Sequence, residues 1–344
     1  MKTLSFIIPS YNSAQFLDKC IGSFLDPQVI DRLDIIIVND GSTDDTPQVA
    51  QKFVDRFPHS IRLINQVNKG HGGALNTGCA AAVGKYLKVI DADDWVETCN
   101  LEFFLNKLDL CESDVVLTHH YTRDISTGEV KKWMSYPPMP GKTYTMEEIM
   151  GSWKSFDRSL TFHGITYKTE FYHRCGIQLS EHVFYEDHEY ATFPCCHARS
   201  VSPMDIFIYD YRIGDIQQSV SDENQLKRIG HTETVLRRMI SEFTALDLPE
   251  ECGGREYVAM KAQGLLLSYL TTAMLVHKDK DAGQKMGETM MELFRKELPR
   301  TAQLASRQYQ IFCMLNRLHI NKATFERILR SKLYNLIRHN HDFK

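Results

Sequence analysis

The stretch "KYLKVIDADDW" (Lys85–Trp95) joins a strand-like apolar run to three carboxylates, those of Asp91, Asp93 and Asp94. Clustered acids do not help to bury a strand, because desolvating like charges is costly unless a cation or a hydrogen-bond network compensates. Oxygen ligands in a D-x-D arrangement suit a hard divalent cation, Mg²⁺ or Mn²⁺. The stretch therefore predicts a strand that ends at a cation site, with an acidic turn that caps the next helix as the alternative.

Three similar apolar runs precede this one, namely "LSFIIP", "LDIIIVND" and "IRLINQ", and segments of helical periodicity separate them. Near-continuous apolar strands that alternate with helices are typical of a parallel sheet covered on both faces. We therefore predict an α/β fold with a doubly wound, mostly parallel sheet. Ligands of such sheets bind outside the carboxyl ends of the strands. The candidates at the first three strand ends are Pro9, Tyr11, Asn12, Asp40, Ser42, Asn68 and Gly70.

The length of the chain, 344 residues with 43% hydrophobic content, predicts two domains or one large domain with an appendage. Strand-like and helical segments are mixed from residue 97 to about 214, and the polar loop "GDIQQSVSDEN" follows. The remaining chain has helical periodicity. We expect an α/β domain over residues 1–215, divided near residue 95, and a helical region over residues 225–344.

Composition indicates where such a protein works. The nine cysteines are scattered without a CxxC pair, which predicts reduced thiols and no structural zinc. The start "MKTLSFIIPSYN" lacks the core of a signal peptide, and no apolar run has the ~18 residues of a spanning helix. We therefore expect a cytoplasmic protein.

Charge is distributed unevenly along the chain. The net charge is -4, but residues 295–344 contain eleven Lys and Arg against three Asp and Glu. The amphipathic end "TFERILRSKLYNLIRHNHDFK" is consistent with packing on the protein itself, which is the simpler account, or with peripheral contact at the inner face of an anionic membrane. Nucleic-acid binding is not expected, because the body of the chain is acidic and carries no recognition motif.

The glycine-rich stretch "GHGGALNTG" (Gly70–Gly78) is not a dinucleotide-binding motif. Leu75 occupies the place of the third glycine, and the Lys-Ser ending of a phosphate-binding loop is absent. Small residues that let a helix pack closely on the sheet account for most of it.

A second acidic pair, Glu186-Asp187, lies in "FYEDHEYATF" at the start of a predicted helix. Carboxylates are common at helix N-termini, so the pair alone has a structural explanation. However, a cation site that serves a reaction on a hydroxyl also needs a general base, and a partly buried carboxylate can act as one.

The ordered set "SFIIPSYN", "IIIVNDGSTDDT", "NKGHGGALNTG…GKYLKVIDADDW" and "FYEDHEYA" resembles the family-2 glycosyltransferases of GT-A type over about residues 3 to 215. The resemblance implies a nucleotide-binding half over residues 1–95 and a half over residues 96–215 that holds the acceptor and the catalytic base. Asp187 matches the base, with Glu186 beside it, and Asp91 and Asp93 match the metal motif. Asp40 matches the acid that binds uracil. Implied donor contacts also come from Pro9, Tyr11, Asn12, Ser42, Asn68, Gly70, Asp91, Arg212 and Ser219.

The resemblance implies an inverting, metal-dependent hexosyltransferase that uses a nucleotide sugar, with UDP favoured over dTDP as the carrier. Its acceptor would be a hydroxyl of a saccharide or a lipid-linked saccharide, in cell-surface polysaccharide synthesis. The sequence departs from the family pattern at two places. Leu75 replaces an arginine common in the family, for which Lys69 or Arg212 could substitute, and the segment around His163 lacks the family's common sequence "WNKLY".

Two other functions compete with the transferase. A non-catalytic nucleotide-sugar-binding protein is the first, although Asp187, Asp91 and Asp93 argue against it. A sugar nucleotidyltransferase is less favoured, because "PSYNSAQF" stands where that class has a basic glycine-rich loop.

Overall fold

The computed structural model describes residues 2–134, 141–214 and 222–329 and divides into two compact units. The first unit comprises Met1–Ile216 and Leu246–Val258, and the second comprises Gln217–Ala245 and Ala259–Lys344. The chain first passes from the first unit to the second after Ile216. In addition, the chain returns to the first unit for Leu246–Val258, which local sequence patterns do not indicate.

The N-terminal half of the first unit is a parallel sheet, as predicted. Its strands β1 (Leu4–Ser10), β2 (Leu33–Asp40), β3 (Ile61–Gln66) and β4 (Tyr86–Val89) lie in the order β3-β2-β1-β4. Every residue of β1, β2 and β4 is buried, which explains why these runs are almost continuously apolar. Because the four strands are parallel, their carboxyl ends lie along one edge of the sheet.

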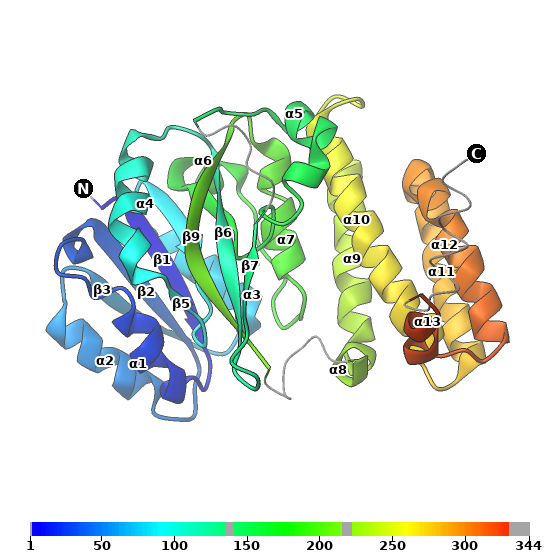
Figure 1. Cartoon of the computed structure of the whole chain (residues 1–344), viewed down its shortest axis with the longest axis horizontal. Coiled ribbons are helices and arrows are strands. Elements are labelled where there is room, and N and C mark those ends of the chain that lie inside the picture. The colour runs from blue at the N-terminus through cyan, green and yellow to red at the C-terminus, as the bar shows by residue number, and fades with distance from the viewer. Residues whose placement is uncertain (1, 135–140, 215–221, 330–344) are drawn as a thin grey trace. The chain divides into compact units, whose positions relative to one another are not determined.

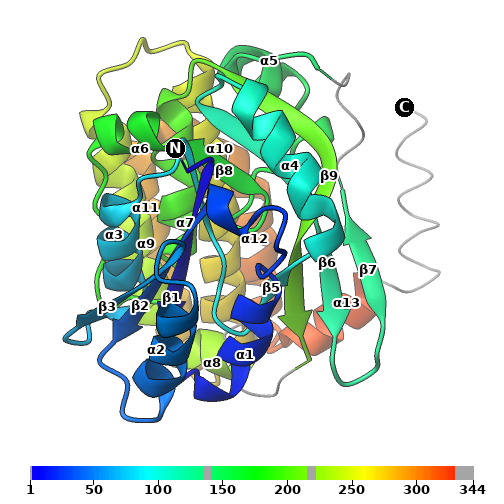
Figure 2. The same cartoon turned by 90° about the vertical axis from the view of Figure 1, so that its left-hand side faces the viewer.

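Helices cover both faces of this sheet (Figures 1 and 2). Phe6 and Ile8 of β1 face a core shared with α1 (Ala14–Gly22), α2 (Thr46–Arg56) and α4 (Thr98–Leu110). Helix α3 (Gly70–Ala81) lies on the opposite face. There, a Cβ at Gly78 would come within 2.4 Å of Ile7 Cγ2. The small residues of α3 therefore serve close packing, as expected.

The sheet continues as a mixed half. Next to β4 come β8 (Ile165–Lys168), β6 (Val115–Asp124), β9 (Val201–Ile213) and β5 (Trp95–Val96), and β7 (Val130–Trp133) pairs with β6. Of these pairs, β6 with β9 is parallel and the others are antiparallel. Short helical segments connect the strands: Ile30–Arg32, α5 (Met146–Gly151), Trp153–Ser155, α6 (Thr169–Cys175), α7 (Asp187–Thr192) and Cys195–His197.

The second unit is helical throughout its described residues. It contains α8 (Asp222–Lys227), α9 (Ile229–Ala245), the later part of α10 (Gly253–Thr271), a π-turn at Thr272–Val276, α11 (Lys280–Glu297), α12 (Pro299–Arg317) and α13 (Lys322–Leu329). Leu270, Met274 and Phe294 are fully buried in it. No helix in the described ranges is both long and apolar enough to cross a membrane. All nine cysteines are free thiols.

Candidate active site

The loops after β1 and β2 are joined through Asn12. This residue has a φ of +50°, a left-handed conformation that asparagine tolerates better than most residues. Its Oδ1 accepts a hydrogen bond from the Thr43 amide at 2.8 Å, and its own amide donates to Ser42 Oγ at 3.0 Å. Pro9 is buried within β1, whereas the Tyr11 side chain is half exposed. Tyr11 and Asn12 are therefore exposed in this turn, whereas Pro9 is not.

Asp40 lies at the end of β2 and is 2% exposed. Its Oδ1 accepts hydrogen bonds from Gln66 Nε2 at 2.7 Å and from the Lys69 amide at 2.8 Å. Asn68 Nδ2 donates to the Asp40 carbonyl at 2.9 Å, which ties the loops after β2 and β3 together. Oδ2 has no hydrogen bond among the described residues. One oxygen of this carboxylate is therefore fixed, and the other can accept a hydrogen bond from a ligand.

The three aspartates after β4 have different environments. Asp94 is buried, and its two oxygens accept hydrogen bonds from the Tyr209 hydroxyl at 2.6 Å and the Arg212 amide at 2.7 Å. Tyr209 Oη also accepts from the Asp91 amide at 3.2 Å. Burial, followed by the charges of Asp91 and Asp93, holds the pKa of Asp94 well above its usual value. Asp94 therefore ties the turn after β4 to β9.

Asp91 and Asp93 keep accessible carboxylates. Their side chains are 29% and 40% exposed. The pKa of Asp93 is raised, first by partial burial and then by the charge of Asp91. Arg212 Nη1 lies 3.5 Å from Asp93 Oδ2 and offsets part of this charge. A pair of oxygen ligands whose negative charge is incompletely neutralised is the environment that a divalent cation favours.

A loop before α7 brings the second acidic pair to this site. Buried Glu189 accepts hydrogen bonds from the Ser180 amide at 2.8 Å and the Ser180 hydroxyl at 2.7 Å. His182 and Tyr185 have φ angles of +54° and +74°, a conformation uncommon for residues with side chains. A Cβ at Gly72 would lie 2.2 Å from the Ser180 carbonyl. The loop therefore lies directly on the first turn of α3, and glycine permits the contact.

His71 connects the two acidic groups. Its Nδ1 lies 2.5 Å from Glu186 Oε1, and its Nε2 lies 2.9 Å from Asp91 Oδ1. Burial alone would lower the pKa of His71, but the hydrogen bonds to both carboxylates and their charges outweigh it and raise the pKa well above the usual value. The imidazolium form can donate to both acids at once.

His71 is the site residue that sequence reasoning missed. It lies one helical turn before buried Leu75, so the two positions share a face of α3. Leu75 stands where the family commonly has an arginine, so the position of His71 one turn away was the available signal that another cation takes the place of that arginine. Of the two substitutes considered from the sequence, Lys69 approaches Glu181 at 3.6 Å and Arg212 approaches Asp93.

Tyr211 shows that Asp187 faces the same space as the aspartates after β4. Burial raises the pKa of Tyr211, and the charges of Asp94, Asp91, Asp93 and Asp187 raise it further. The Asp187 carboxylate, which is half-buried, has no hydrogen bond within the described part of the chain. The structure thus brings together Asp91, Asp93, Glu186, Asp187 and Arg212, while Ser219 lies outside the described residues.

Comparisons with known proteins identify a family. The family model "Glycosyl transferase family 2" matches residues 5–175. "Putative glycosyltransferase EpsH" of Bacillus subtilis is 30% identical over 216 residues, which are 61% of this chain and 60% of that protein. A chondroitin synthase of Escherichia coli is 35% identical over 119 residues, which are 35% of this chain and 17% of that protein. The chain therefore spans less than two thirds of the length of these relatives.

Solved structures show the fold. The 1–349 segment of S. aureus TarS superposes with a TM-score of 0.63 and 18% identity, over 92% of both chains. The same segment in complex with UDP-GlcNAc superposes with a TM-score of 0.57, over 93% of both chains. The parallel sheet, its continuation as a mixed sheet and the helical unit therefore form a GT-A fold with a helical C-terminal region, as expected. By the match of residues 5–175, the chain belongs to glycosyl transferase family 2.

Proposed function

We propose that the chain is an inverting glycosyltransferase that moves a sugar from a nucleoside-diphosphate sugar to a hydroxyl of a saccharide or lipid-linked saccharide. The observation that carries the proposal is the position of Asp187. Its carboxylate, which has no hydrogen bond among the described residues, faces the same space as Asp91 and Asp93. An ionised carboxylate beside an acidic cation site is the arrangement that a hydroxyl-deprotonating transferase needs.

The nucleotide would bind along the ends of β1, β2 and β3. Asp40 presents one carboxylate oxygen without a hydrogen bond from the described residues, and that oxygen can accept the N–H of a uracil ring. Tyr11, half exposed beside it, offers an aromatic face for the base. UDP is the proposed carrier, because the S. aureus TarS structure of the same fold holds UDP-GlcNAc.

Asp93, together with Asp91, would hold Mg²⁺ or Mn²⁺. The donor set fits: both carboxylates are accessible, and the pKa of Asp93 is raised by burial and by Asp91, which indicates uncompensated negative charge. A divalent cation held by these residues would supply positive charge against the departing diphosphate. Arg212 can contribute to the same neutralisation from its place beside Asp93.

Asp187 would accept the proton of the acceptor hydroxyl while the hydroxyl oxygen forms a bond to the anomeric carbon of the donor. The bond from that carbon to the diphosphate oxygen breaks in the same step, and the nucleoside diphosphate leaves with the electron pair. One displacement inverts the anomeric centre, so an α-linked donor gives a β-glycoside. Similarity to a chondroitin synthase supports a growing cell-surface polysaccharide as the acceptor class.

The test is turnover of a panel of UDP- and dTDP-sugars with Mn²⁺ or Mg²⁺, by wild type, Asp187→Asn and Asp93→Ala. Glu170→Gln, which removes an exposed carboxylate on α6, is the control. The proposal expects turnover of one donor with metal, loss of activity in Asp187→Asn and Asp93→Ala, and retained nucleotide binding by Asp187→Asn. Donor binding without turnover in wild type would instead indicate a non-catalytic nucleotide-sugar-binding protein.

A further inference from the structure

Helix α12 has an exposed apolar stripe. Leu304, Ile311, Met314 and Leu318, the last just beyond the helix end, are 59%, 36%, 53% and 61% exposed. They are separated by seven, three and four residues, so their side chains lie along one side of the helix. Contiguous exposed apolar side chains on a helix mark an interaction surface more often than scattered single ones do.

The same helix has only positive charge. Its exposed cations are Arg300, Arg307 and Arg317, and Pro299–Arg317 contains no Asp or Glu. Within the described ranges, no ion pair or hydrogen bond reaches these three guanidinium groups. Two arginines of α9, in the same unit, behave differently: Arg237 lies 2.8 Å from Glu233 and Arg238 lies 3.4 Å from Glu242.

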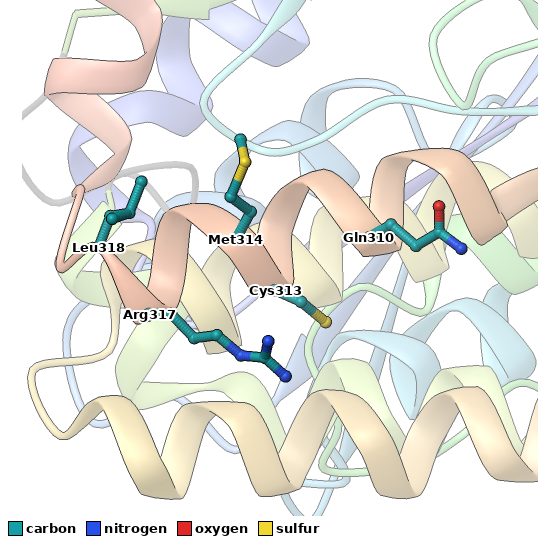
Figure 3. Close-up of a pocket in the computed structure, with 5 residues that line it drawn as sticks. All are labelled: Gln310, Cys313, Met314, Arg317 and Leu318. Atoms are coloured by element: carbon teal, nitrogen blue, oxygen red, sulfur yellow. The ribbon is translucent and has the colours of Figure 1, made fainter.

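The apolar and basic groups are interleaved on one face. Along the helix the order is Arg300, Leu304, Arg307, Ile311, Met314 and Leu318, with alternating spacings of four and three. In Figure 3, Met314 and Leu318 rise from the same side of α12, and Cys313 and Arg317 project from the other side. Beside this end of the helix is a hollow of about 480 Å³, lined by Gln310, Cys313, Met314, Arg317 and Leu318.

We propose that this basic and apolar face of α12 binds the surface of an anionic lipid bilayer. Amphipathic helices with aliphatic side chains and arginines on one face lie in the bilayer interface, where the aliphatic groups enter the acyl boundary and the guanidiniums contact lipid phosphates. Arg300 and Arg307 on this face have no acidic partner on α12, and anionic head groups would supply one. The proposal does not depend on the identity of the donor or the acceptor.

Other occupants match this face less well. A second copy of the same face offers apolar side chains and arginines but no carboxylate, so pairing would desolvate guanidiniums without a counter-charge. The end of the chain, residues 330–344, contains four Lys and Arg and one Asp. Repulsion between like charges therefore disfavours its binding to the basic face of α12, and the same charges add to the attraction of the chain to an anionic surface.

The experiment is co-sedimentation of the full chain with vesicles of phosphatidylcholine alone or with about 30% phosphatidylglycerol added. One variant carries Arg300→Gln and Arg307→Gln, the two arginines on the side of α12 that carries the apolar stripe. The charge-matched control carries Arg237→Gln and Arg238→Gln on α9. A surface arginine contributes roughly fivefold to partitioning, so the double arginine variant should bind anionic vesicles roughly 25-fold more weakly, while the control loses far less.

A second variant, Leu304→Gln with Leu318→Gln, tests the apolar part and should bind roughly tenfold more weakly, because less aliphatic surface enters the interface. Circular dichroism checks that each variant is folded. The proposal is overturned by wild type that stays in solution with anionic vesicles, by full binding of the double arginine variant or the leucine variant, or by equal loss in the α9 control. It is also overturned if light scattering shows that wild type is a dimer and that the leucine variant is a monomer, because the face is then an interface between two copies of the chain.

Discussion

Tyr209→Phe tests whether the turn that carries the acidic cluster is held by a single buried hydroxyl. In wild type, Tyr209 Oη donates to Asp94 at 2.6 Å and accepts from the Asp91 amide at 3.2 Å. Tyr209 is fully buried and Asp94 is 1% exposed. Water therefore has little access to replace the hydroxyl in the variant.

The expected loss follows from these two contacts. Leaving a buried donor or acceptor without its partner costs about 1–3 kcal/mol, and the variant leaves two such groups, the Asp94 carboxyl oxygen and the Asp91 amide. We therefore expect Tyr209→Phe to lower the free energy of unfolding of the α/β unit by about 3 kcal/mol. With a urea dependence of about 3 kcal/mol per M, the unfolding midpoint should fall by about 1 M.

Tryptophan fluorescence during urea titration is the assay. The chain has three tryptophans, Trp95, Trp133 and Trp153, and all belong to the first unit, so the signal reports on that unit. Tyr211→Phe is the matched control, because this tyrosine lies two positions along the same strand and its hydroxyl has no hydrogen bond among the described residues. Equal midpoints for the two variants would refute the assignment of Asp94 as a structural residue.

Three further predictions concern Lys88, His71 and Gly72. Burial lowers the pKa of fully buried Lys88 to about 7. Between that pH and the pKa of lysine in the unfolded chain, only the unfolded chain holds the proton. The free energy of unfolding should therefore rise with pH, by at most about 1.4 kcal/mol per pH unit, and Lys88→Met should abolish this rise in urea titrations at pH 7 to 10. In His71→Gln the donors are on a single nitrogen and do not span the two carboxylates as the two ring nitrogens do. Hydrolysis of the donor that wild type turns over should therefore slow roughly tenfold to a hundredfold, while calorimetry shows little change in UDP binding; a loss of UDP binding instead would place His71 in the nucleotide site. Gly72→Ala would place its Cβ 2.2 Å from the Ser180 carbonyl and should lower the urea midpoint by the equivalent of about 1–3 kcal/mol, whereas Gly22→Ala, with nothing within 4 Å, should leave the fold unharmed.

The parallel half of the fold and most of the candidate residues were predictable from sequence. The strands β1, β2 and β4 are buried on both faces, so their apolar runs are visible in a short window of sequence. The mixed half was harder to predict. Strand β9 (Val201–Ile213) mixes buried, half-buried and exposed positions, so no simple apolar run marks it. Its partners β6 and β5 are far from it in the chain, and local periodicity does not identify partners.

The roles of individual site residues depended on distant contacts. The motif placed Asp91, Asp93 and Asp94 together but did not distinguish them, because Asp94 is set apart by Tyr209, 115 residues away in the chain. The contact between His71 and Glu186 joins residues of the same separation. In sequence, His71 is one of 14 histidines, and its place one helical turn before Leu75 is the one feature that distinguishes it.

The sequence by itself determined which segments form the parallel sheet and that acids follow β4, because hydrophobic periodicity and strand-end polarity are properties of neighbouring residues. Only the tertiary structure decided that Asp94 is a structural tie, that His71 links Asp91 to Glu186, and that α12 keeps an apolar and basic face exposed. Burial and the partners of a charged group depend on segments that meet in space after folding. The energy of a carboxylate, an imidazole or an exposed leucine is therefore set by those segments and not by its neighbours in the chain.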